Sequence, residues 1–155
     1  MNQGPVLIAY DGSAHAKAAI ERAGAVLAHG PAVVATAWTS FEGAAPAALL
    51  ALPGDIVRDS AGMLDDAGRE AAERLAAEGA ELARAAGFEA EPRAVRSSGP
   101  FFAALLEAAR ELDARVIVAG SRGRSAIAAA VLGSVSTGIL HHAGRPVLIV
   151  HDAAS

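Results

Sequence analysis

The chain has 155 residues, a formal net charge of −4 and no cysteine; 53% of its residues are apolar and 19% are charged. This length suits a single domain over 1–155 with a sizeable core, and the apolar share is too high for a disordered protein. The missing cysteines exclude a disulfide framework, a thiolate metal site and a cysteine nucleophile, and the mildly acidic balance without a basic run argues against a nucleic-acid or anionic-membrane partner.

The first residues, Met1–Pro5, contain no basic segment and lead directly into a short apolar run. They do not have the features of a signal peptide. The longest uninterrupted apolar stretch, Ala126–Leu132, has seven residues, against the ~20 that a membrane-spanning helix needs. We therefore expect a cytoplasmic protein.

Short apolar runs alternate with longer helical patterns along the sequence. The expected strands are Val6–Tyr10, Ala32–Trp38, Phe88–Arg96, Arg115–Ala119 and Pro146–Val150. The apolar periodicity between them predicts helices over about 13–28, 61–86, 100–112 and 134–142.

Local signals add detail to three of these elements. Ser13 is expected to cap the first helix, and the charged third strand is expected at an edge of the sheet. The apolar stripe of the second helix is expected to comprise Ala71, Leu75, Leu82 and Ala86. Thr39–Ser60, rich in Ala, Pro and Gly, is predicted to be a long loop of undefined role.

This alternation predicts an α/β fold, namely a doubly wound five-stranded parallel sheet of strand order 3-2-1-4-5 with helices on both faces. Ligands of such sheets bind beyond the carboxyl ends of the strands, where the winding direction reverses. Here that point lies between the first and fourth strands, so the segments that begin at Asp11 and Gly120 are the first places to look for chemistry.

The segment after the fourth strand has the pattern of an anion-binding loop. Nine residues separate Gly120-Ser121-Arg122-Gly123 from Gly133-Ser134-Val135-Ser136, which opens the last predicted helix. Glycines let backbone N–H groups approach a phosphate, and the first N–H groups of a helix point outward at its positive dipole end. The serines add hydroxyl groups, and Arg122 and Arg124 add charge. Alternatively, the same glycines only form turns and a helix start.

Two better-known phosphate-binding patterns are absent from the sequence. It contains no G-x4-G-K-[ST] loop, since Lys17 is the only lysine, and no G-x-G-x-x-G after the first strand. A P-loop nucleoside triphosphatase and a standard dinucleotide-binding Rossmann domain are therefore disfavoured.

Three segments in order resemble the universal stress protein family. Val6–Ser13 resembles its first strand and loop, Gly120–Ser136 its ATP-binding motif, and His141–Val150 its last helix and strand. The family has one branch that binds ATP and one that lacks the glycine motif. Because the motif is complete here, the resemblance implies the ATP-binding branch, a nucleotide-dependent regulator of the stress response.

The resemblance also implies a set of phosphate- and ribose-binding residues in the last loop and helix: Gly120, Gly123, Gly133, Ser134, Val135 and Ser136. Asp11 would contact the ribose or a phosphate-bound Mg²⁺, its alternative role being that of a turn residue. Ala37 would offer backbone atoms to the adenine, unless the frame shifts by one to Thr36 or Trp38. Trp38 is otherwise either a core residue or a wall of the pocket.

A homodimer is expected through the last strand. Val147-Leu148-Ile149-Val150 lies at an edge of the predicted sheet and contains no charge or proline that would block pairing with a second copy. The family resemblance implies the same dimer.

Two other functions remain open. The site could serve a slow ATPase or phosphotransferase, with Arg122 and Arg124 at the γ-phosphate, although no residue stands out that would position water. The protein could also be an interaction scaffold that binds no nucleotide. We expect ATP, with Mg²⁺, as the ligand and no catalytic residue.

Overall fold

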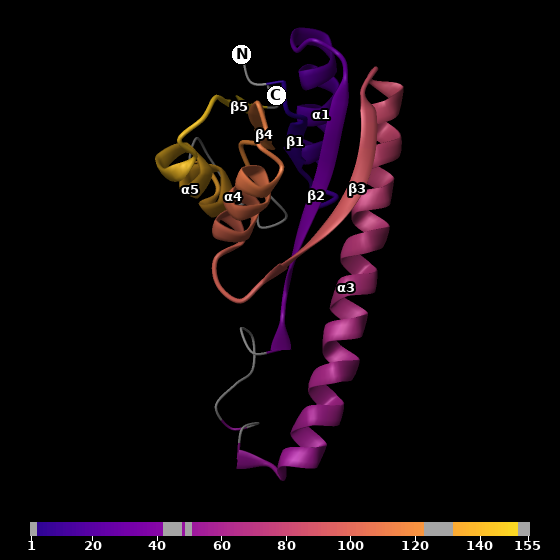
Figure 1. Cartoon of the computed structure of the whole chain (residues 1–155), viewed down its shortest axis with the longest axis vertical. Coiled ribbons are helices and arrows are strands. Elements are labelled where there is room, and N and C mark those ends of the chain that lie inside the picture. The colour runs from indigo at the N-terminus through magenta and orange to yellow at the C-terminus, as the bar shows by residue number, and fades with distance from the viewer. Residues whose placement is uncertain (1–2, 42–47, 49–50, 123–131, 152–155) are drawn as a thin grey trace.

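The computed structural model describes residues 3–41, 48, 51–122 and 132–151. In sequence order its elements are β1 (Val6–Ala9), α1 (Ala14–Val26), β2 (Pro31–Thr39), α3 (Gly54–Ala85), β3 (Glu89–Ser97), α4 (Phe101–Glu111), β4 (Val116–Gly120), α5 (Ser134–His142) and β5 (Val147–Val150) (Figure 1). Gly123 and Arg124 of the predicted phosphate loop lie outside the described residues.

The strands form one parallel sheet of order β3-β2-β1-β4-β5, which confirms the predicted topology. β1 lies at the centre, and its Val6 is paired with Ala32 of β2 and Val116 of β4. β3 lies at an edge, as its alternating charges indicated.

Helices cover both faces of the sheet. Val6 and Ile8 of β1 pack in a cluster with α1 and α3, whereas Leu7 packs in a second cluster with α4 and α5. Because successive residues of a strand point to opposite faces, a strand covered on both sides needs apolar residues throughout. This requirement explains the continuous apolar run of β1.

The element boundaries follow the sequence closely, with one exception. Ser13 caps α1 as predicted, since its Oγ accepts the Ala16 N–H at 3.1 Å. α3, however, begins at Gly54 and not near Ala61, so the predicted loop 39–60 is shorter than expected. Proline is tolerated at a helix start and an acid in the first turn favours the helix dipole, so Pro53-Gly54-Asp55 opens a helix where composition suggested a loop.

The predicted apolar stripe of α3 is confirmed only in part: Leu75 and Ala86 are partly buried and pack against the core, whereas Ala71 and Leu82 are exposed. Leu82 is 36% exposed, and the buried residues of the helix are Ala72, Ala76, Gly79, Ala80 and Ala83. Small residues are needed on this face because α3 lies close to the sheet: a Cβ at Gly79 would come within 2.8 Å of the Tyr10 ring. A leucine in place of Gly79 would not fit at this separation.

Two lengths determine what lies at the carboxyl edge of the sheet. β2 has nine residues and continues past the end of β1, which has four. α3 has 32 residues, runs alongside β2 and β3 and extends well beyond most of the sheet (Figure 1).

Despite its length, α3 carries charged residues throughout. None of the helices in the described part of the protein is long and apolar enough to cross a bilayer.

Candidate functional site

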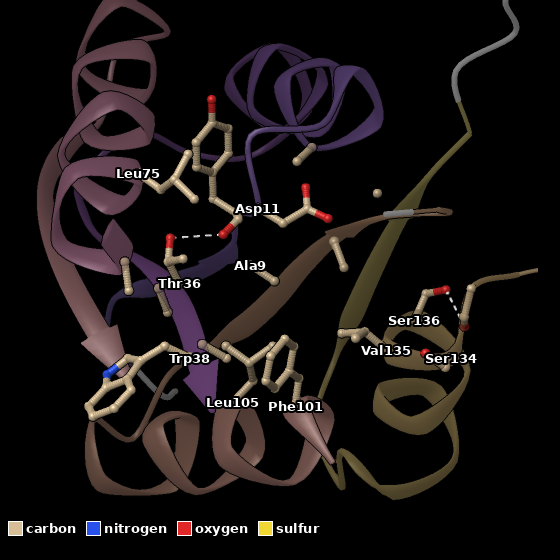
Figure 2. Close-up of a pocket in the computed structure, with 18 of the residues that line it drawn as sticks. Ala9, Asp11, Thr36, Trp38, Leu75, Phe101, Leu105, Ser134, Val135 and Ser136 are labelled. Atoms are coloured by element: carbon tan, nitrogen blue, oxygen red, sulfur yellow. Dashed lines mark hydrogen bonds between the residues drawn. The ribbon is translucent and has the colours of Figure 1, made fainter. Parts of the chain in front are cut away.

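A cavity of about 820 Å³ lies at the carboxyl ends of β1, β2 and β4 (Figure 2). This is the reversal point between β1 and β4 at which the topology predicted a ligand, and the volume falls in the range of small-molecule sites. Of the residues that the sequence singled out for binding, all those in the described part of the protein line this cavity: Asp11, Ala37, Gly120, Arg122, Gly133, Ser134, Val135 and Ser136.

The end of the cavity near β4, here called the backbone end, comprises Gly120, Arg122 and the start of α5 (Gly133–Ser136). Gly133 is the N-cap of α5 and has an extended backbone. The first bond within the helix runs from the Thr137 N–H to the Gly133 C=O at 2.9 Å. The N–H groups of the three residues between them have no partner within the helix. This end of the cavity is therefore suited to an anion.

Ser136 holds this helix start in place. Its hydroxyl is buried and lies within hydrogen-bonding distance of the C=O groups of Ser121 (3.1 Å) and Gly133 (3.0 Å). The Gly133 N–H also donates to the Ser121 C=O, at 2.7 Å. The hydroxyl of Ser136 thus joins α5 to the end of β4, which leaves its N–H group as the contact it can offer to a ligand.

Gly120 has a packing role that is independent of any ligand. A Cβ at this position would lie 2.8 Å from the carbonyl carbon and the carbonyl oxygen of His15. Only glycine therefore lets α1 pack this closely against the end of β4.

Asp11 lies between the two ends of the cavity and forms a local turn (Figure 2). Its Oδ1 accepts the Ser13 N–H at 2.9 Å, which is the turn role considered as an alternative. A carboxylate has about four acceptor positions, so this bond does not exhaust it. Within the described residues no group of three or more His, Cys, Asp or Glu residues could hold a metal, so a cation at Asp11 would need oxygens from its ligand.

The opposite end, here called the apolar end, is formed by residues of β2, α3 and α4. Trp38, Leu75, Phe101 and Leu105 line it, and Trp38 and Ser134 lie at opposite sides of the view in Figure 2. Thr36 also lines this end, but its hydroxyl donates to the Tyr10 C=O at 2.8 Å. This end therefore offers mainly apolar surface.

The backbone of β2 supplies polar groups beside this apolar surface. The Tyr10 N–H donates to the Ala35 C=O at 2.9 Å, so odd-numbered residues of β2 direct their backbone groups toward β1. β1 has ended by the level of Ala37, whose N–H and C=O consequently point toward the cavity that it lines. Thr36 and Trp38 direct theirs toward β3, with which β2 is paired.

Tyr10 directly follows β1, lines the cavity and is bonded to α3. Its hydroxyl donates to the Glu78 carboxylate, which lies 3.4 Å from the Lys17 ammonium. Burial and this hydrogen bond raise the pKa of Tyr10 well above its ordinary value, and the same bond lowers the pKa of Glu78. The sequence did not reveal this network, because its members come from the residue after β1, from α1 and from α3.

Sequence reasoning also missed Gly68, Leu75, Phe101 and Leu105 as cavity residues. They are spread over α3 and α4, and nothing in their sequence context distinguishes them from core residues. Trp38, left open between core and wall, lines the cavity.

The structure is that of a small α/β protein with a cavity at the point where the winding of its sheet reverses. The model of the universal stress protein family matches residues 4–151, so the chain belongs to that family. A curated universal stress protein from Mycolicibacterium smegmatis is 46% identical over 39 residues. The matched segment spans 25% of this chain and only 13% of that relative's length.

Solved structures resemble the whole protein. A universal stress protein in complex with cAMP has a TM-score of 0.62 and 30% identity, covering 97% of this chain and 99% of its own. An Archaeoglobus fulgidus universal stress protein in complex with dAMP has a TM-score of 0.59 and 19% identity, covering 96% and 98%. A third structure, that of a protein called hypothetical when it was solved, has a TM-score of 0.78 and 19% identity over 100% of both chains. At 19% identity the last two establish the fold alone.

Proposed function

We propose that this protein is one nucleotide-binding domain that binds ATP and acts as a cytoplasmic, nucleotide-dependent regulator of the stress response and not as an enzyme. The observation that carries the proposal is the difference between the ends of the cavity. One end presents the N–H groups that open α5, and the other presents an apolar wall beside the backbone of Ala37. A nucleotide has the same division between its phosphates and its base.

The phosphates are assigned to the backbone end. The N–H groups of Ser134, Val135 and Ser136 would bond phosphate oxygens, and Arg122 would supply positive charge. Gly120 and, by its place in the motif, Gly123 would complete the loop. Mg²⁺ usually takes one or two protein carboxylates and completes its shell with phosphate oxygens and water. A single carboxylate at Asp11 fits that pattern.

The adenine is assigned to the apolar end. The N–H and C=O of Ala37 can bond the acceptor and donor at the edge of adenine, whereas guanine presents a different pattern. GTP should therefore bind more weakly, by about 1–2 kcal/mol for one such edge contact. The cAMP named for the related structure at 30% identity contains adenine, which supports this assignment.

A thermal unfolding experiment tests ATP binding. ATP with Mg²⁺ should raise the melting temperature, because it binds only the native state. Gly133→Asp should abolish that rise by placing a carboxylate where phosphate belongs. Gly99→Asp is the matched control, since a Cβ at Gly99 meets no atom within 4 Å and Gly99 does not line the cavity. A folded Gly133→Asp protein that responds to ATP like the wild type would show that the site is wrong.

Mass spectrometry of the gently purified protein separates the regulator from its rivals. Co-purified ATP is expected and would exclude the scaffold. Co-purified ADP with steady phosphate release would favour the slow ATPase, and an empty protein that gives no thermal response to ATP would favour the scaffold.

We also propose a homodimer through β5. The two edges of the sheet differ: β3 carries Pro92 and alternating charges, which block edge pairing, whereas β5 (Val147–Val150) is apolar throughout. Val147, Leu148 and Ile149 are only partly buried in the single protomer. Symmetric pairing with a second copy would cover them.

Light scattering tests the dimer. The wild type should scatter as twice 15.5 kDa, and a Leu148→Pro, Ile149→Asp double variant as a monomer. A monomeric wild type at micromolar concentration contradicts the dimer. A folded, fully dimeric variant moves the interface to another surface.

A further inference from the structure

The indole of Trp38 packs against α3 at Gly68, in the space left by the missing side chain. A Cβ added at Gly68 would lie 3.2 Å from Cε3 and 3.8 Å from Cζ3 of this ring, so the indole fills the space that a larger residue at position 68 would need. Both residues line the apolar end of the cavity. Trp38 is also the only tryptophan of the protein.

This contact is specific to Gly68 and is not shared by the preceding glycine of α3. Gly62 lies six residues earlier in α3, and a Cβ there meets no atom within 4 Å. Glycine is unfavourable inside a helix, because it loses the most freedom on folding and has no Cβ with which to pack. At Gly68 the absence of a Cβ, although it destabilises the helix, leaves room for the Trp38 indole.

The helix cannot readily move away from Trp38. One turn before Gly68, Asp65 accepts the Phe41 N–H at 2.6 Å and lies 3.8 Å from the Arg96 guanidinium. On the other side of Gly68, Ala72 is buried. A larger residue at position 68 would therefore displace the indole and narrow the cavity, because the backbone is held on both sides of the contact.

We propose that Trp38 is the surface against which the nucleotide base stacks, and that Gly68 determines the room available for the base. The inference rests on the proposed nucleotide-binding function and specifies its selectivity. Planar bases stack favourably on an aromatic ring. Trp38 thus recognises the flat shape of the base, while the backbone of Ala37 contacts its edge.

The fluorescence of the single tryptophan tests the contact directly. Titration of the wild type with ATP or with adenosine should change Trp38 emission, whereas inorganic tripolyphosphate should leave it unchanged at saturation. Binding is followed independently by calorimetry. Calorimetric ATP binding with no change in emission, or an equal change with tripolyphosphate, would overturn the inference.

Paired variants test the role of Gly68. Gly68→Leu should lower the affinity for ATP and for adenosine by about tenfold, the usual size of one base–aromatic stack. The affinity for tripolyphosphate should not change. Gly62→Leu in the same helix is the control and should bind all three ligands like the wild type. Trp38→Leu should lower adenosine affinity as Gly68→Leu does. Trp38→Phe keeps an aromatic ring and should retain most of that affinity. Circular dichroism confirms that each variant is folded.

The outcomes separate this inference from the proposed function. If the wild type binds ATP and the Gly68→Leu and Trp38→Leu variants bind adenosine as tightly as the wild type does, Trp38 is not the stacking surface. Nucleotide binding at the cavity would then still stand. A Phe101→Ala variant that loses adenosine affinity when Gly68→Leu does not would move the base to the α4 side and also overturn the inference. If the wild type binds neither ATP nor adenosine, the proposed function itself fails.

Discussion

The two ends of the cavity are built in different ways. The described residues of the backbone end, Gly120, Arg122 and Gly133–Ser136, lie close together in the sequence, and this end presents mostly backbone groups. The apolar end draws on β2, α3 and α4, and its surface consists of large residues such as Trp38, Leu75 and Phe101. Exposed N–H groups require glycines and a helix start at fixed spacing, which leaves a pattern in the sequence. An apolar wall requires only that residues of the right volume meet in space.

The two ends should therefore respond differently to substitution. At the backbone end the polypeptide is closely packed, so added atoms should be harmful. At the apolar end the volume of the residues maintains the shape, so removed atoms should be harmful. The predictions below test this contrast, beginning with the largest expected effect on the free energy of unfolding.

Leu105→Ala tests the apolar end. Leu105 is 3% exposed and packs in the cluster with Leu7 and Ile117. The substitution should lower the free energy of unfolding by about 2–3 kcal/mol, the lower part of the range for buried leucine because one side already faces a cavity. Leu140→Ala, at a residue that is 46% exposed, is the control and should change stability by less than about 0.5 kcal/mol. Urea unfolding measures both, and equal effects would contradict the contrast.

Gly120→Ala tests the backbone end. The added Cβ would lie 2.8 Å from backbone atoms of His15, so the start of α1 must shift. Overpacking of this kind should lower the free energy of unfolding by about 1–3 kcal/mol. Gly99→Ala adds the same atom where none lies within 4 Å. Chemical denaturation of both proteins should show a loss only for Gly120→Ala; two unaffected proteins would mean that α1 adapts freely.

Much of the fold was readable from the sequence, because its signals are local. The apolar run of β1 reflects helices on both faces, the Ser13 cap a bond three residues along the chain, and the charges of β3 an edge position. The buried face of α3 was readable only in part, since Leu75 and Ala86 were predicted on it and the fully buried alanines were not. Alanine occurs on every side of that helix, and the choice between Ala72 and Leu82 for the buried face depends on how closely the helix approaches Tyr10.

At the site, too, local patterns were readable from the sequence and contacts between distant residues were not. The glycine pattern located the backbone end, including Gly133 and Ser136. It could not distinguish the roles of these residues, since the Ser136 hydroxyl is used within the protein and Gly120 is required by His15. The contact between Trp38 and Gly68 joins residues 30 positions apart, and no property of either residue alone predicts it.

Ser136→Ala separates the structural use of the hydroxyl from ligand binding. Loss of the hydrogen bond to Ser121 or Gly133 should lower the free energy of unfolding by about 1 kcal/mol. The effect stays small because both C=O groups keep a second donor, the N–H of Gly133 and of Thr137 respectively. Ser134→Ala, at the exposed neighbouring position, should leave stability unchanged. Equal loss in the two variants, measured by urea unfolding, would contradict the assigned role of Ser136.

The last prediction concerns Tyr10, which lines the cavity and whose contribution to the free energy of unfolding should depend on pH in the alkaline range. Burial and the bond to Glu78 raise the pKa of Tyr10, whereas an unfolded tyrosine ionises near pH ~10. The stabilising contribution is therefore fully present below pH ~10 and is lost as the pH rises above it, because the unfolded state then releases a proton that the folded state retains.

Absorbance at about 295 nm can follow this ionisation selectively, because Tyr10 is the only tyrosine. Tyrosinate should appear together with unfolding and not before it, and Tyr10→Phe should have a shallower loss of stability above pH ~10. Bound ATP should delay both events, since it stabilises the folded state. Tyrosinate that forms in a fully folded protein near pH ~10 would mean that burial and the bond to Glu78 do not raise the pKa of Tyr10, and this prediction would then fail.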